Sequence, residues 1–251
     1  MTITRKVVWS LFDGSGLMIQ PWAEAGYECY AFNADSGDHG AYDMRVEHPN
    51  IHYVDSWIEP GFDPAGRPAV RDGRIWKIPE PGIIFAFPPC TLMAHSGAKH
   101  QRAEDDVSEA VALAKVAMAL GEKYDCPWMV ENPVGKLSTL WRKPDAYFNP
   151  HEYGGFLLES EGSFHPKMPV CDGYTKKTCL WFGNGFEMPA RNPGPVNIGK
   201  FWGWAFLGGK SAKTKQLRSL TPRGFARAVF AANHFQCGCT GECACDDCIP
   251  F

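Results

Sequence analysis

The stretch from residue 82 to residue 130 constrains the fold more than any other part of the chain. It begins with the continuous apolar run "GIIFAF" (82–87), typical of a strand covered on both faces. After a loop, "EDDVSEAVALAKVAMALGEKYD" (104–125) has acids in its first turn and apolar residues at helical spacing, and "PWMV" (127–130) is a second short strand. A strand–loop–helix–strand unit of this length joins parallel neighbours.

The rest of the chain extends the same pattern. Residues 6–12, "KVVWSLF", predict a first strand, and "LMIQPWAEAG" predicts a helix that Gly26 caps. The remaining predicted elements are two strands at 27–32 and 50–58, a Pro- and Gly-rich loop at 59–81 and a final helix at 222–235. The fold class expected is α/β, with a doubly wound and mostly parallel sheet.

Composition limits the compartment and the partners. No apolar run approaches membrane-spanning length, and the N-terminus does not have the pattern of a secretory signal. Five of the ten cysteines are scattered through the body and five fall in the last fifteen residues, which is unlike a secreted disulfide framework. We therefore expect a cytoplasmic protein with no membrane partner.

The charge is unevenly distributed along the chain. The net charge is −3, yet residues 188–241 contain no acid and eight Lys or Arg. Such a segment is either a solvated basic face or a surface that binds a polyanion, and we favour the polyanion.

Polar residues follow three of the predicted strands where each ends. They are the "DGSG" turn with Asp13, Gly14 and Gly16, the "PPC" elbow that ends at Cys90, and "ENP" beginning at Glu131. Each is weak evidence alone, since a lone Cys is more often a buried small side chain. Ligands of doubly wound sheets collect at the carboxyl ends of the strands, so the three together predict a site.

The succession "LFDGSG", "FAFPPCT", "VENPVG", "KKTCLWF" and "RSLTPRGFAR" resembles the DNA cytosine-5 methyltransferases, and is closest to short, phage-type members. The resemblance covers most of the chain. It implies a Rossmann-like methyltransferase fold with a small, irregular recognition region. The domain boundaries that follow are a catalytic domain at 1–185, a DNA-recognition region at 186–217, a returning helix at 218–236 and a Cys-rich tail at 237–251.

The resemblance also implies a reaction. Cys90, held by Pro88 and Pro89, would add to C6 of a flipped cytosine in double-stranded DNA, while Glu131 would protonate or hydrogen-bond ring nitrogen N3. The enamine would then attack a one-carbon donor, which in this family is S-adenosylmethionine. Ionisation of the thiol needs help, since a free Cys has a pKa of about 8.5; a helix N-terminus, His95 or Lys99 could supply it.

The remaining site residues are carried over from the family motifs. For the cofactor they are Phe12, Asp13, Gly14, Gly16, Asn33, Asp35 and Pro88. For the DNA substrate they are Pro89, Asn132, Pro133, Lys176, Lys177, Thr178, Arg218 and Arg223.

Three departures from the family pattern keep alternatives open. Asn33 stands where an acid is expected, with Asp35 two residues on, no "GNAV"-like motif follows the final helix, and the recognition region is short. The first two concern the cofactor, so methylene-tetrahydrofolate, giving 5-hydroxymethylcytosine, is an alternative donor. A catalytically silent DNA-binding relative and an enzyme acting on a free nucleotide are the other hypotheses.

The C-terminal "CGCTGECACDDC" has thiol spacings that suit tetrahedral zinc. The candidate ligands are Cys237, Cys239, Cys243, Cys245 and Cys248. The alternative is a tail that binds metal only adventitiously.

Overall fold

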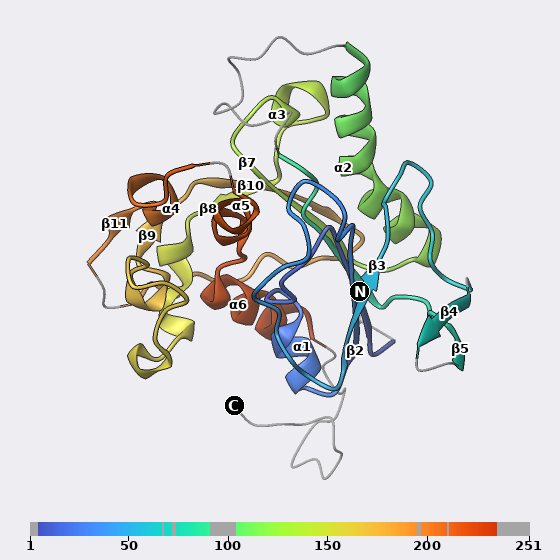
Figure 1. Ribbon diagram of the computed structural model, residues 1–251, viewed down its shortest axis with the longest axis horizontal. Helices are drawn as coiled ribbons and strands as arrows, with labels where there is room; N and C mark the ends of the chain where they lie inside the picture. The colour runs from blue at the N-terminus through green and yellow to red at the C-terminus, as the bar shows by residue number, and fades with distance from the viewer. Residues whose placement is uncertain are drawn as a thin grey trace.

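The computed structural model describes residues 5–66, 68–71, 74–90, 104–194, 197–209 and 211–234. Its centre is a mixed sheet of seven strands in the order β3-β2-β1-β6-β7-β10-β8 (Figure 1). The strands are β1 (Val7–Leu11), β2 (Glu28–Asn33), β3 (Ile51–Asp55), β6 (Ile83–Ala86), β7 (Trp128–Pro133), β8 (Ala146–Phe148) and β10 (Thr178–Gly183).

Neighbouring strands from β3 to β7 pair in parallel, and β10 is antiparallel to both β7 and β8. The predicted parallel strands at 6–12, 27–32, 50–58, 82–87 and 127–130 are confirmed, as is the long helix, α2 (Glu104–Tyr124). The sheet is therefore the expected α/β arrangement, consistent with a Rossmann-like fold.

The loop expected at 59–81 is wrong in part. Two antiparallel strands, β4 (Pro68–Arg71) and β5 (Arg74–Lys77), form a separate two-stranded sheet within it. The sequence between them is Asp-Gly, a dipeptide typical of a tight hairpin, so a local indication of these strands was present in the sequence.

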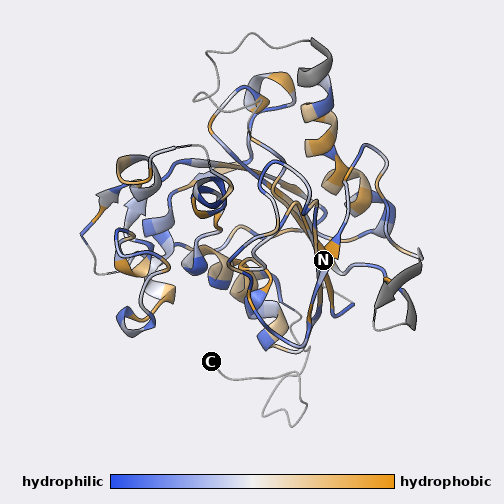
Figure 2. Ribbon diagram, viewed as in Figure 1, coloured by the Kyte–Doolittle hydropathy of each residue, from blue (hydrophilic) through white to orange (hydrophobic). Residues whose placement is uncertain are grey.

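The two faces of the sheet are covered by different helices. Along β1, Val8 packs in the core beside α1 (Gln20–Glu24) and α6 (Arg223–Asn233), while its neighbour Trp9 packs in the core beside α2. Successive side chains of a strand point to opposite faces of the sheet. Because both faces are buried here, apolar residues occupy consecutive positions along the strand. The central strands are accordingly hydrophobic along their length (Figure 2).

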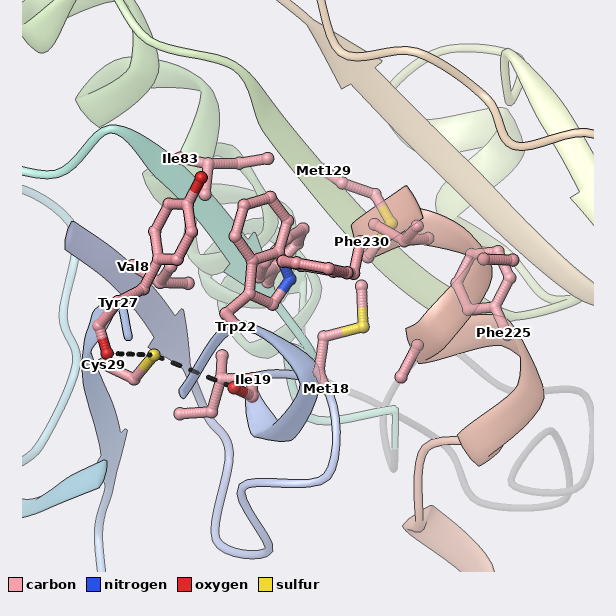
Figure 3. Packing of buried hydrophobic residues seen from close by; sticks show 14 of the residues in the cluster. Val8, Met18, Ile19, Trp22, Tyr27, Cys29, Ile83, Met129, Phe225 and Phe230 are labelled. Atoms are coloured by element: carbon pink, nitrogen blue, oxygen red, sulfur yellow. Dashed lines mark hydrogen bonds between the residues drawn. The ribbon is translucent and has the colours of Figure 1, made fainter. Parts of the chain in front are cut away.

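Trp22 of α1 joins three parts of the first core. Its ring meets those of Tyr27 and Phe230 edge to face, each at a centroid distance of 5.1 Å, as Figure 3 shows. Edge-to-face pairs of this kind add to the free energy gained by burying the rings. They fix α6, the last described helix, against the first helix of the chain.

A smaller unit lies beside the sheet. Its own core contains Met168, Tyr174, Phe201 and Trp202, which are all buried. Its elements are the 3₁₀ helices η2 (Pro150–Phe156), η3 (Glu159–Glu161) and η4 (Val170–Asp172), strands β9 (Tyr174–Thr175) and β11 (Gly199–Lys200), and helices α4 (Trp202–Ala205) and α5 (Ala212–Ser219). The small unit contains residues from before and after residue 186, whereas the predicted recognition region begins at residue 186.

One further short helix, α3 (Leu137–Leu140), follows β7. Within the described ranges, no helix combines the length and apolar character needed to cross a bilayer.

Candidate active site

The site lies at the point in the sheet where the order of the strands reverses. The chain passes outward from β1 to β2 and β3, then returns to place β6 on the other side of β1, so the carboxyl ends of β1 and β6 flank a switch point. The loops leaving these two strands carry Asp13 and Cys90.

Asp13 organises the turn after β1. Its buried carboxylate accepts hydrogen bonds from the backbone nitrogens of Ser15 (2.9 Å) and Gly16 (2.8 Å) and from the Ser10 hydroxyl (2.7 Å). Phe12 and Gly16 both adopt positive φ, at 57° and 74°, as this tight reversal requires. The predicted cofactor residues of this loop are thus held in one rigid turn.

Aromatic side chains cover both glycines of the turn. A Cβ at Gly14 would lie 2.0 Å from the ring of Tyr42, and one at Gly16 would lie 2.4 Å from the Tyr53 hydroxyl oxygen. The Tyr53 hydroxyl in turn reaches the carbonyls of Ser15 and Val46, each at 3.0 Å. The glycines permit close approach, as expected, but the groups that approach belong to this chain.

Tyr42 belongs to a loop segment, residues 38–43, that joins the turn after β1 to α5; we call this segment the strap. The Gln216 side-chain amide donates to the His39 carbonyl (2.7 Å) and the Ala41 carbonyl (2.9 Å), and the Tyr42 hydroxyl lies 2.8 Å from Ser219 Oγ. Burial raises the pKa of Tyr42 to about 12, with the charges of Asp13 and Cys90 adding to the rise. Residues 38–43 therefore connect the turn after β1 to α5.

Asn33 and Asp35, the residues predicted to bind the cofactor ribose, lie at the end of β2 and are already hydrogen-bonded within the protein. Asn33 Nδ2 donates to Asp35 Oδ1 (2.8 Å), and Arg45 Nη2 donates to the same oxygen (2.6 Å). Arg45 also reaches the Gly14 carbonyl through Nε (3.3 Å) and covers the Tyr53 ring. The acid available to a cofactor ribose is thus already paired with a cation.

These contacts decide how S-adenosylmethionine fits the residues present. The Tyr42 ring occupies the space over Gly14, and Asp35 is neutralised by Arg45. A cofactor that used this turn would therefore have to displace the Tyr42 ring and compete with Arg45 for Asp35.

Asn132 connects the two strands that carry the reactive side chains. Its buried Nδ2 donates to the Pro88 carbonyl across 2.9 Å, joining the segment after β6 to the end of β7. The strand expected to end at residue 130 continues to Pro133, because Glu131 to Pro133 pair with β10, so Glu131 lies within the strand and not after it. Pro88 is buried and Pro89 exposed, so the elbow turns outward at Cys90. Among the described residues, no donor reaches Asn132 Oδ1.

Cys90 and Glu131 are both partly buried, and one cation acts on both. Burial raises the pKa of Cys90, the positive charge of Lys176 lowers it, and the Glu131 carboxylate raises it further. Burial also raises the pKa of Glu131, again opposed by Lys176. Glu131 thereby tends to hold a proton, and the Cys90 thiol needs a partner to ionise.

The residues predicted to contact DNA separate into two groups. Lys176, Lys177 and Thr178 lie at the start of β10, where Thr178 pairs with Pro133 of β7. Lys176 Nζ donates to the Arg218 carbonyl (3.1 Å), and Lys177 is exposed over the Tyr147 ring.

The two arginines serve the small unit. Arg218 Nε donates to the Gly203 carbonyl (2.9 Å), holding α5 to α4. Arg223 Nη2 donates to the Gly162 carbonyl (2.6 Å) and lines a cavity of about 130 Å³ between α1, η3 and α6. Both arginines therefore make contacts within the protein.

Sequence reasoning missed Tyr42, Tyr53 and Arg45. Each acts through tertiary contacts with a turn far away in the sequence, and no local pattern marks them. His95, Lys99 and the five tail cysteines lie outside the described residues. In the part of the chain that is described, no group of three metal-ligating side chains occurs.

Comparison with known proteins identifies no family. No family model matches the sequence, and no curated protein is significantly similar to it.

Proposed function

We propose that this chain is a DNA cytosine C5 one-carbon transferase, with methyl transfer as the leading reaction. The observation that carries the proposal is the hydrogen bond from Asn132 Nδ2 to the Pro88 carbonyl. It ties the Pro-Pro-Cys elbow after β6 to the carboxyl end of β7, which contains Glu131, and so supports placing a nucleophile and an acid at one edge of the sheet.

The proposed reaction uses these two groups in sequence. The Cys90 thiolate forms a bond to C6 of cytosine while Glu131 supplies a proton to N3, and the resulting enamine has a nucleophilic C5. C5 would then take the methyl group from the donor, whose bond to that carbon would break and leave its electron pair with the donor. Solvent would take the C5 proton, the C5–C6 double bond would re-form as the C6–sulfur bond breaks, and N3 would return its proton to Glu131.

The pKa directions suit these roles. Burial raises the pKa of Glu131, and this direction favours the protonated carboxyl that N3 requires. Protonation of Glu131 also removes a negative charge that raises the pKa of Cys90, leaving Lys176 to favour the thiolate. A protonated Glu131 and an ionised Cys90 are therefore compatible states of one site.

The donor follows from the family resemblance and is S-adenosylmethionine in the leading proposal. Methylene-tetrahydrofolate remains the second candidate, because Asn33 lacks the expected charge and Asp35 is paired with Arg45. The proposed substrate is a cytosine flipped out of duplex DNA, and the basic segment 188–241 suits that polyanion. An intracellular location, with the enzyme acting in the cell that makes it, belongs to the same proposal.

Mass spectrometry of nucleosides from cells expressing the protein tests the function, with Cys90→Ala as the matched control. A Cys90-dependent methyl group on deoxycytidine supports the methyltransferase. A Cys90-dependent hydroxymethyl group supports the folate donor. Unmodified DNA in both samples contradicts the proposal and favours a DNA-binding relative without activity.

A further inference from the structure

We infer that Trp204 is a stacking platform for a DNA base that loses its stacking neighbour when the target cytosine leaves the duplex. The inference rests on the proposed function, because it assigns a binding role within the small unit. It concerns two side chains that neither the core nor the active site uses, Trp204 and Phe206, which we call the aromatic corner.

The aromatic corner is exposed but rigidly supported. Trp204 and Phe206 are 69% and 60% exposed, among the most exposed large apolar side chains of the described chain. The Trp204 ring stands edge to face on buried Phe201 at a centroid distance of 5.4 Å. The backbone beneath is held by Arg218 at the Gly203 carbonyl. An exposed ring on a fixed base loses little conformational entropy when it binds a partner.

Cations surround the aromatic corner. Lys176 Nζ lies 5.3 Å from the centroid of Phe201, and Lys167 Nζ lies 5.6 Å from that of Phe206. Lys200, at the end of β11, is exposed and immediately precedes Phe201 in the sequence, and the sequence contains no acid from residue 188 to residue 241. Exposed aromatic rings interleaved with lysines are the combination that binds nucleic acid, since the rings stack on bases and the lysines neutralise phosphates.

A chain of contacts leads from the aromatic corner to the reactive residues. Trp204 contacts Phe201, Phe201 lies under Lys176, and the charge of Lys176 acts on both Cys90 and Glu131. A cytosine that leaves the duplex for Cys90 leaves neighbouring bases without a stacking partner. The exposed Trp204 ring, supported by Phe201, can supply one.

The test compares Trp204→Ala with Trp57→Ala in the full-length protein. Trp57 is a matched control, because it is 63% exposed but lies between Asp55 and Glu59 rather than among lysines. The probe is a fluorescently labelled DNA duplex with one mispaired cytosine, and the readout is the dissociation constant from anisotropy at several salt concentrations. Trp204→Phe, which keeps an aromatic ring, is the conservative variant.

We expect Trp204→Ala to weaken binding between about fivefold and about a hundredfold, the range for one stacked base. The salt dependence should stay unchanged, because a stacking ring releases no counterions. Trp57→Ala should bind as the wild type does, and Trp204→Phe should retain most of the affinity.

Equal affinity of the Trp204→Ala and wild-type proteins overturns the inference, as does an equal loss in Trp57→Ala. So does a change of oligomeric state in Trp204→Ala with DNA affinity unchanged, since the corner would then bind a second copy. Failure of the proposed function is distinguishable: DNA left unmodified by the wild type, together with Trp204-dependent binding, removes the enzyme but keeps the stacking platform.

Discussion

The side-chain amide of Asn132 donates to the carbonyl of Pro88 across 2.9 Å, and both groups are buried. This one bond joins segments 44 residues apart in the sequence. It makes the position of the Cys90 elbow depend on β7, the strand that carries Glu131.

Asn132→Ala should lower both stability and activity. The Pro88 carbonyl would be left buried without a donor, at a cost of about 1–3 kcal/mol in the free energy of unfolding. Asn50→Ala is the matched control, because Asn50 Nδ2 makes the same kind of bond to the Ala23 carbonyl (3.1 Å) away from the site. Urea unfolding should detect a loss in both variants, whereas DNA modification should fall only in Asn132→Ala. Normal modification by Asn132→Ala would separate the bond from the reaction.

Glu131→Gln should make Cys90 more reactive towards alkylation while abolishing transfer to cytosine. The ionised Glu131 carboxylate raises the pKa of Cys90, so over the pH range in which Glu131 is ionised its removal lowers that pKa and increases the thiolate fraction. The rate of iodoacetamide labelling against pH, followed peptide by peptide, measures this at Cys90 separately from the tail cysteines. An exposed acid on α2, Glu122, gives the control Glu122→Gln. A labelling profile unchanged in Glu131→Gln would contradict the coupling.

Lys176→Gln should have the opposite effect on the thiol. Its charge lowers the pKa of Cys90 and of Glu131, so both pKa values should rise without it. Labelling of Cys90 at a given pH should then be slower than in the wild type. Lys177→Gln should leave Cys90 unchanged, because the neighbouring lysine acts on Cys179 instead. Equal labelling rates at Cys90 in Lys176→Gln and the wild type would show that the cation lies too far away to matter.

Tyr42→Ala should strengthen binding of S-adenosylmethionine if that cofactor uses the glycine turn. The ring covers Gly14, and its hydroxyl is held by Ser219, so the closed strap competes with the ligand. Tyr42→Phe keeps the ring but loses the hydroxyl contact, and should show a smaller gain. Calorimetric titration of the three proteins measures the order. Weaker binding by Tyr42→Ala would mean that the ring itself contacts the cofactor.

The ion pair between Glu161 and Arg227 should make stability depend on pH in acid. Burial raises the pKa of Glu161, but hydrogen bonds from Arg227 and the Leu158 backbone outweigh it, so the pKa is lowered on balance. The pair therefore stabilises the fold above the unfolded-state pKa of about 4.3, and this contribution is lost as the pH falls through the lower folded-state pKa. Glu161→Gln should remove that part of the pH dependence, worth on the order of 1 kcal/mol for a half-exposed pair. Urea unfolding at several acidic pH values measures this. The same change in the free energy of unfolding with pH in the wild type and Glu161→Gln would contradict the prediction.

How far the sequence predicts this molecule depends on whether local patterns or distant contacts decide each feature. Continuous apolar runs and one long amphipathic helix determine the five parallel strands and α2, so these were predicted. Strand β8 has only three residues, and the position of β10 in the sheet is set by its pairing with β7. Neither strand therefore has a local sequence pattern sufficient to predict it. The roles of Tyr42 and Arg45 arise from contacts with Gly14, roughly thirty residues earlier, which no spacing rule anticipates.

The most direct test of the central claim is covalent trapping on a DNA duplex whose cytosine carries fluorine at C5. Without a C5 proton, the ring cannot expel the sulfur after one-carbon transfer, so the adduct should persist through denaturing electrophoresis. We expect an adduct at Cys90 with the wild type and one of the two donors, and no adduct with Cys90→Ala. The adduct mass should identify the transferred group. An adduct that forms equally with Cys90→Ala, or the absence of any adduct with the wild type and either donor, would contradict the assignment of Cys90 as the nucleophile.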